Sequence, residues 1–364
     1  GVLLAGGLHR LQADRSADLF LEKARDDAEN GDAEDANRSY QSYLRLRPTD
    51  SDARSELAKL SYDNGSYENA LGQLEYYLRL VPGDRESRRM AARSALLIGR
   101  YSDCREHLNR LMTGEPDAEL LDWLGQCQVG ELKYDQSVES YAQSIELAPD
   151  RLEPYQRLAK VLYNHLDQKD DAEIVIEQMV ARNPESSPAM LAYSQFLQSR
   201  AIQFTSSGDT ELAREKYEAA KDAAKASVTL DSTNADALLL LASCELFLNQ
   251  IDDARDHAKE AQRLRPQASS IYRLLAGIES TAGNSDQALE WLTLGIENVS
   301  DGDREELVAG RASYLLDLGR AGEALSAIEQ LRSVQPDSAA LRFLQARLEM
   351  ANGQWLREFD SLVN

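Results

Sequence analysis

The chain has 364 residues, a length that ordinarily predicts two or three globular domains. Hydrophobic residues make up 43% of it, and its 20 glycines and 9 prolines are too few for a disordered chain, so we expect a continuous folded core. Acidic residues outnumber basic ones by 62 to 40 and the net charge is −22. This charge argues against general nucleic-acid binding, because that binding depends on neutralising phosphates.

The first eight residues are apolar, and the sequence turns polar from His9 onward. Such a stretch is too short to cross a bilayer, which requires about 20 residues. It predicts either the end of a membrane anchor or signal segment, or a terminal helix that belongs to no complete repeat. We treat residues 1–16 as an N-terminal stub and expect it to be the remnant of a membrane anchor.

A pattern with a period of 34 residues begins near Ala17. Three classes of residue keep this step: Gly31, Gly65 and Gly99; Pro48, Pro82 and Pro116; and Ala36, Ala70 and Cys104. The glycine ends a first helix, the alanine lies in a second helix, and the proline stops that second helix because it lacks an N–H group. The clearest copy carries Leu57, Ala58, Gly65, Tyr67, Ala70, Leu74, Leu78, Leu80 and Pro82.

This copy resembles the tetratricopeptide repeat, a helix–turn–helix unit of 34 residues. The resemblance covers the chain from about Ala17 and implies an all-α fold, an α-solenoid that forms a right-handed superhelix of about ten repeats. We predict repeats 1–5 in residues 17–184, a sixth repeat in residues 185–234, and repeats 7–10 in residues 235–364, with the last one truncated.

The sixth repeat is longer than the others. Pro184 and the equivalent Ser232 are 48 residues apart, 14 more than the usual 34. Fourteen residues are about four helical turns, which predicts two extra turns on each helix, with Gly208 in the turn between them. Ile202, Phe204 and Leu212 lie near the predicted tip, where they either pack against one another or form a docking surface.

No catalytic or metal-binding motif is found in the sequence. The four histidines, His9, His107, His165 and His257, lie in different repeats without ligand spacing, and the three cysteines, Cys104, Cys127 and Cys244, form no C-x-x-C. The glycines follow the repeat and form no phosphate-binding loop, and no serine lies in G-x-S-x-G. We therefore expect no enzyme activity, no cofactor and no metal.

The resemblance implies a concave groove that is lined by first helices. In the family, one contact position directly follows the small packed residue of the first helix, and here that position holds Arg25, Lys59, Arg93, Gln126 and Lys160. Arg89 and Arg157 lie one turn earlier, and we expect the aromatic side chains of Tyr62, Trp123 and Tyr163 to share the groove. These residues predict either a binding site for an acidic extended segment or an ordinary solvated surface.

The first functional hypothesis is a non-catalytic scaffold that binds other proteins and is tethered to a bacterial membrane. The alternative is the regulatory or substrate-recruiting arm of a larger enzyme, such as a glycosyltransferase or a peptidase. A co-chaperone is disfavoured, because the first three repeats have no groove-lining asparagine to complete a carboxylate clamp. We expect protein partners and no nucleic acid, and a location at the membrane or otherwise in the cytoplasm.

Overall fold

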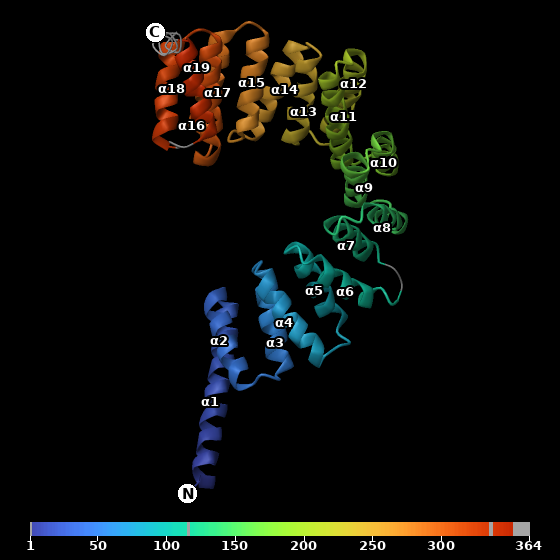
Figure 1. The fold of residues 1–364 in the computed structure, drawn as a ribbon, viewed down its shortest axis with the longest axis vertical. Helices are drawn as coiled ribbons and strands as arrows, with labels where there is room; N and C mark the ends of the chain where they lie inside the picture. Colours follow the sequence, from blue (N-terminus) through green and yellow to red (C-terminus); the bar gives the residue numbers. More distant parts are fainter. Residues whose placement is uncertain (1, 115–116, 335–337, 352–364) are drawn as a thin grey trace, which may run out of the picture. The chain divides into compact units, whose positions relative to one another are not determined.

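The computed structural model describes residues 2–114, 117–334 and 338–351, and this part of the chain consists of 19 helices without a strand (Figure 1). The predicted all-α class is confirmed. The chain divides into two compact units, unit 1 (Gly1–Val175) and unit 2 (Ile176–Asn364). Pro116 and the truncated end of the predicted tenth repeat, residues 352–364, lie outside the described residues.

Unit 1 is a series of helix pairs. In chain order its helices are α1 (Val2–Glu29), α2 (Ala33–Leu46), α3 (Ser51–Asp63), α4 (Tyr67–Leu80), α5 (Arg85–Leu97), α6 (Tyr101–Leu111), α7 (Ala118–Gly130), α8 (Tyr134–Leu147), α9 (Leu152–His165) and α10 (Lys169–Arg182), which continues into unit 2. The predicted stub belongs to the same helix, α1, as the start of the first repeat. Among the described helices, none is both long and apolar enough to cross a membrane.

Unit 2 continues the same pairing of helices. Its helices are α11 (Ser187–Ser207), α12 (Thr210–Leu230), α13 (Ala235–Phe247), α14 (Ile251–Leu264), α15 (Ser269–Thr281), α16 (Ser285–Asn298), α17 (Asp301–Asp317), α18 (Ala321–Val334) and α19 (Ala339–Ala351). The odd-numbered helices are the first helices of the repeats and the even-numbered ones are the second helices.

Local signals in the sequence set the limits of the first helices. Asp50 and Asp84 cap α3 and α5, since each carboxylate accepts hydrogen bonds from backbone N–H groups of the first turn. Gly65 ends α3 in the left-handed region, with a φ of +73°. The same turn elsewhere holds Leu132 and Asn249, with φ values of 61° and 62°, so the left-handed turn is kept where glycine is absent.

Small residues allow the two helices of a pair to come close together. Ala58 in α3 and Ala70 in α4 have no exposed surface, and in unit 2 the same is true of Ala254 in α14 and Ala288 in α16. Leucine and tyrosine side chains fill the remaining space around these contacts. The apolar core therefore runs along each unit, from one repeat to the next.

A buried side chain of the first helix holds the turn that precedes it. Arg54 and Arg88 each donate a hydrogen bond to the carbonyl oxygen of the proline six residues earlier, at 2.9 and 2.7 Å. The hydroxyl groups of Tyr155 and Tyr272 donate to the equivalent proline carbonyls, at 3.3 and 2.6 Å. Two chemically different side chains thus make the same contact in different repeats.

The long repeat has helices of 21 residues each, compared with 13 or 14 in most of the other repeats. Its two helices meet near the tip through Ala201 and Ala213, which are buried. Ile202 and Leu212 are 52% and 43% exposed, so the alanines, and not these larger residues, fill the contact between the helices. Phe204 lies beneath the guanidinium group of Arg200, 5.1 Å from the ring centre.

Candidate functional site

First helices of unit 1 surround a cavity of 420 Å³. Five of the nine predicted groove residues line it: Tyr62 from α3, Arg89 and Arg93 from α5, Trp123 from α7 and Arg157 from α9. The other lining residues are Glu86, Met90, Glu119, Asp122, Arg151 and Glu153. Four arginines and four carboxylates therefore face one space, and their formal charges balance.

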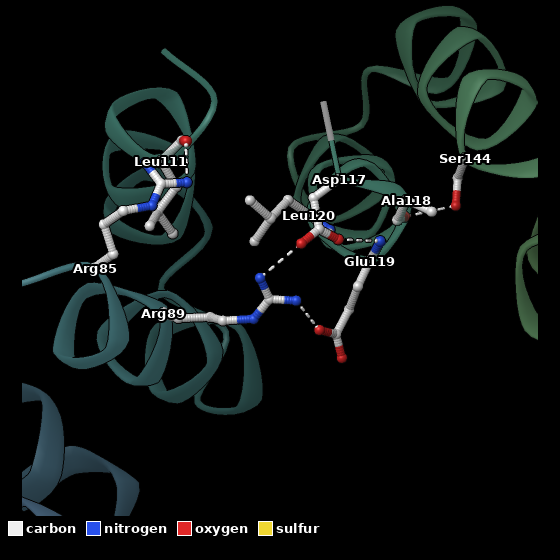
Figure 2. A network of polar contacts seen from close by, with 8 residues as sticks. All are labelled: Arg85, Arg89, Leu111, Asp117, Ala118, Glu119, Leu120 and Ser144. Carbon is white, nitrogen blue, oxygen red and sulfur yellow. Dashed lines mark hydrogen bonds and ion pairs between the residues drawn. The ribbon is translucent and has the colours of Figure 1, made fainter. Parts of the chain in front are cut away.

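Arg89 joins α5 to α7 (Figure 2). Its Nη1 donates to Oδ2 of Asp117 at 2.7 Å, and its Nη2 is bonded to Glu119. Asp117 also caps α7 by accepting from the backbone N–H of Glu119 at 2.8 Å. Partial burial tends to raise the pKa of Asp117, but the hydrogen bonds from Arg89 and from the helix backbone outweigh it, and the pKa is lowered. The charge of Arg89 is therefore already neutralised within unit 1.

Arg157 is neutralised in a similar way. Its Nη1 donates to both carboxylate oxygens of Asp122, at 2.7 and 2.6 Å. Asp122 is only 2% exposed, and this burial raises its pKa, although the positive charge of Arg157 acts in the opposite direction. The pair fixes α9 against α7 on one side of the cavity.

Arg93 is the cavity arginine that makes no ion pair with any described residue. Its guanidinium carbon lies 5.4 Å from the centre of the Trp123 ring, and Arg89 lies at the same distance from that ring. Trp123 is only 7% exposed, so its indole serves mainly as the apolar floor beneath the two guanidinium groups. Burial raises the pKa of Tyr62, which Arg93 partly opposes, so the Tyr62 hydroxyl stays protonated and can donate a hydrogen bond.

The remaining four predicted groove residues do not line this cavity. Arg25 makes a bidentate ion pair with Glu56, at 2.8 and 3.0 Å. Lys59 and Lys160 are exposed and have no ion pair within the described part of unit 1. Tyr163 is half-buried, and the ammonium group of Lys169 lies 5.8 Å from its ring centre.

The sequence matches family models described as tetratricopeptide repeat, over residues 21–85 and 310–361 for one model and 211–278 for a second. Together these matches cover just over half of the chain. The chain belongs to the tetratricopeptide repeat family. Such arrays use extended concave surfaces to bind other proteins, so the chain is a protein-interaction scaffold. Tetratricopeptide repeat proteins are typically non-catalytic.

Solved structures of other tetratricopeptide repeat proteins are similar in fold. MamA from Desulfovibrio magneticus RS-1 is 18% identical, with a TM-score of 0.40 over 46% of this chain and 96% of that one. PilW, described as a type IV pilus biogenesis factor, is 19% identical, with a TM-score of 0.47 over 63% and 98%. A repeat protein from Parabacteroides merdae is 16% identical, with a TM-score of 0.45 over 72% and 99%. No curated protein matches the sequence.

The sequence reasoning omitted the carboxylates that accompany the groove arginines. Glu56 and Glu119 lie 31 and 30 residues after Arg25 and Arg89, about one turn short of the full repeat of 34. A carboxylate at that offset falls on the next first helix, beside the arginine. This offset is a signal that a search for inter-repeat ion pairs could have used.

Within the described residues, no cluster of histidine, cysteine, aspartate or glutamate side chains could hold a metal ion. Cys104, Cys127 and Cys244 are buried and not joined to one another by a disulfide. Burial raises the pKa of the Cys244 thiol to about 12, which keeps it protonated and therefore a poor nucleophile near neutral pH.

Proposed function

We propose that the first helices of unit 1 bind an extended segment of a partner protein that carries acidic side chains. The observation that supports this proposal is the position of Arg93, a cation without an ion-pair partner, beside Tyr62 and above Trp123 in the 420 Å³ cavity. A carboxylate there would gain a charge-assisted hydrogen bond from Arg93. The apolar floor would contact the neighbouring part of the segment.

Two further cations at the same repeat position favour an extended ligand over a compact one. Lys59 and Lys160 directly follow the small packed residues Ala58 and Ala159, as Arg93 follows Ala92. Both lysines are exposed and make no ion pair with described residues. Successive first helices of such an array lie about 10 Å apart. Acidic side chains separated along an extended segment would match this spacing.

The ion-paired arginines have a different part in this proposal. Arg89 and Arg157 each neutralise a carboxylate of the same cavity and hold their helices in place. Breaking these pairs to reach a ligand would leave Asp117 or Asp122 without its cation. Their contribution to binding is therefore positional, and the attraction for an acidic segment comes from Lys59, Arg93 and Lys160.

Charge reversal on the intact chain tests the proposal. The probe is a fluorescein-labelled peptide with alternating glutamate and leucine, and its affinity is measured by fluorescence anisotropy. We expect the double variant Lys59→Glu and Arg93→Glu to weaken binding at least about tenfold at low salt, and added salt to weaken binding to the parent chain. The same peptide with glutamine in place of glutamate should bind poorly.

The matched control is Arg45→Glu with Arg79→Glu. These arginines are exposed on the second helices α2 and α4, and they give the same change in net charge. The control variant should bind nearly as well as the parent chain, and circular dichroism should show unchanged helical content for both variants. Equal affinity of the groove variant and the control variant would show that the groove cations are only a solvated surface.

A further inference from the structure

The second helices of unit 2 carry a surface of a different kind, centred on Trp291 of α16. Two cavities, of 760 and 650 Å³, lie on either side of this tryptophan, and its side chain lines both. The smaller cavity is formed by α14, and the larger one by α16 together with Arg311 of α17 and the start of α18. The indole is half-buried, because it also packs against the apolar clusters around Leu275 and Leu292.

The larger cavity has an excess of negative charge. It is lined by four carboxylates, Asp286, Glu290, Glu297 and Glu323, and by two arginines. Arg320 is bonded to Asp286 at 2.7 Å and to Glu323 at 2.6 Å, and these three groups therefore satisfy one another. Arg311 is the second cation, and its Nε is buried without a hydrogen-bond partner in the described structure.

Glu290 and Glu297 are the carboxylates left over from these pairs. Both are exposed, and neither forms an ion pair with a residue that the structure describes. They are seven residues apart on α16, which is two helical turns or about 10 Å, so they lie on the same side of the helix. Leu294, 38% exposed, lies between them. The outward side of α16 thus reads acidic, apolar, acidic, with Trp291 alongside.

We infer that Glu290, Trp291, Leu294 and Glu297, which we call the Trp291 surface, bind a basic amphipathic helix of a partner protein. Two basic residues spaced two turns apart would reach Glu290 and Glu297. An apolar residue between them would cover Leu294, and a basic side chain over the indole would gain a cation–π contact. The argument for this occupant is charge complementarity. A second copy of this chain is a poor occupant, since its net charge is −22.

This inference goes beyond the proposed function of the unit 1 groove. The Trp291 surface lies on second helices, belongs to unit 2 and selects the opposite charge. A chain with both surfaces could hold an acidic segment of one protein and a basic helix of another at the same time. Failure of either test leaves the other binding surface unaffected, because the two tests use different peptides and different variants.

The test uses isothermal titration calorimetry on the full chain. The probe is a helical peptide with lysines seven residues apart and a leucine between them, and its counterpart carries glutamates at the two lysine positions. The lysine peptide should bind the parent chain, and the glutamate peptide should not. Glu290→Gln combined with Glu297→Gln should weaken binding of the lysine peptide about fivefold or more, as expected for the loss of two ion pairs.

Glu211→Gln combined with Glu329→Gln is the matched control. These exposed glutamates of α12 and α18 lie outside both cavities, and their replacement changes the net charge by the same amount. This control variant should bind the lysine peptide like the parent chain. The inference is overturned if both double variants bind equally well, which would indicate general attraction to an acidic protein, or if the parent chain shows no heat of binding.

Discussion

The first helices of the two units share one packing position and differ at the residue that follows it. In unit 1 this following residue is Lys59, Arg93, Gln126 or Lys160. In unit 2 it is Gln195, Ser243, Gly277, Ser313 or Arg347. Arg347 is the cation of the unit 2 set, and it is bonded to Ser313 at 2.7 Å and to Asp317 at 2.6 Å. Cations without an ion pair at this position are thus found in the described part of unit 1 and not in that of unit 2.

The difference separates what the fold requires from what binding requires. The packing position itself is small and buried in both units, as Ala58 and Ala92 show in unit 1 and Ala242 and Ala312 in unit 2. One residue later, about 100° further round the helix, the side chain leaves the packed contact and its charge can vary freely. The chemistry of the groove can therefore change from repeat to repeat while the array stays the same.

The largest effect is expected from overpacking the small contacts, and it should be the same in both units. Ala70→Leu in unit 1 and Ala254→Leu in unit 2 each place a larger side chain where no surface is exposed. Each change should lower the free energy of unfolding by about 1–3 kcal/mol, measured by urea denaturation. Ala340→Leu, on the exposed side of α19, is the control and should have little effect. A melt unchanged by Ala254→Leu alone would show that the units are packed differently.

A smaller effect is expected at the turn that ends the first helix. Leu132 in unit 1 and Asn249 in unit 2 both adopt a positive φ, but leucine is strained there and asparagine tolerates it. Leu132 is 72% exposed, so little packing is lost on its removal. Leu132→Gly should raise the free energy of unfolding by about 0.5–1 kcal/mol, and Asn249→Gly by less. Thermal melting would measure both, and a larger gain from Asn249→Gly would contradict this account.

The smallest effect concerns pH, and it should have opposite signs in the two units. The hydrogen bond to Glu245 raises the pKa of His257 in unit 2, so its stabilising contribution is fully present below the unfolded-state pKa and is lost as pH rises through the folded-state pKa. In unit 1, burial and the nearby Arg88 lower the pKa of His107, so stability falls as pH drops below its unfolded-state pKa of about 6.5.

Thermal melts of His257→Gln and His107→Gln between pH 5 and pH 8 would measure these contributions. The loss from His257→Gln should be greatest at the acid end, at roughly 0.2–1 kcal/mol, the range of exposed ion pairs. His107→Gln should instead reduce the sensitivity of the chain to acid. If both substitutions changed stability equally at all pH values, the two histidines would have no part in the pH dependence.

The helix pairs could be predicted because their signals are local. A glycine in a left-handed turn, a capping aspartate and a small residue at the helix contact each act within a few residues, and the period of 34 repeats them. The ion pairs could not be read in the same way, because Arg89 chooses between several carboxylates of the next helix. Trp123 shows a second limit: we predicted an open groove contact, but a ring of that size extends from the groove into the core, and most of it is buried.

The hydrogen bond from the first helix to the preceding proline carbonyl has a mechanical consequence. A stretched repeat array lengthens mainly at the joints between repeats, and each such bond acts as a clasp on one joint. Arg54, Arg88, Tyr155 and Tyr272 supply a clasp. At the equivalent positions of α11 and α13 the chain has Met190 and Leu238, which have no N–H or O–H group in the side chain to donate. Under tension, the joints before these two helices have no clasp of this kind, so the array is a spring with uneven stiffness along its length.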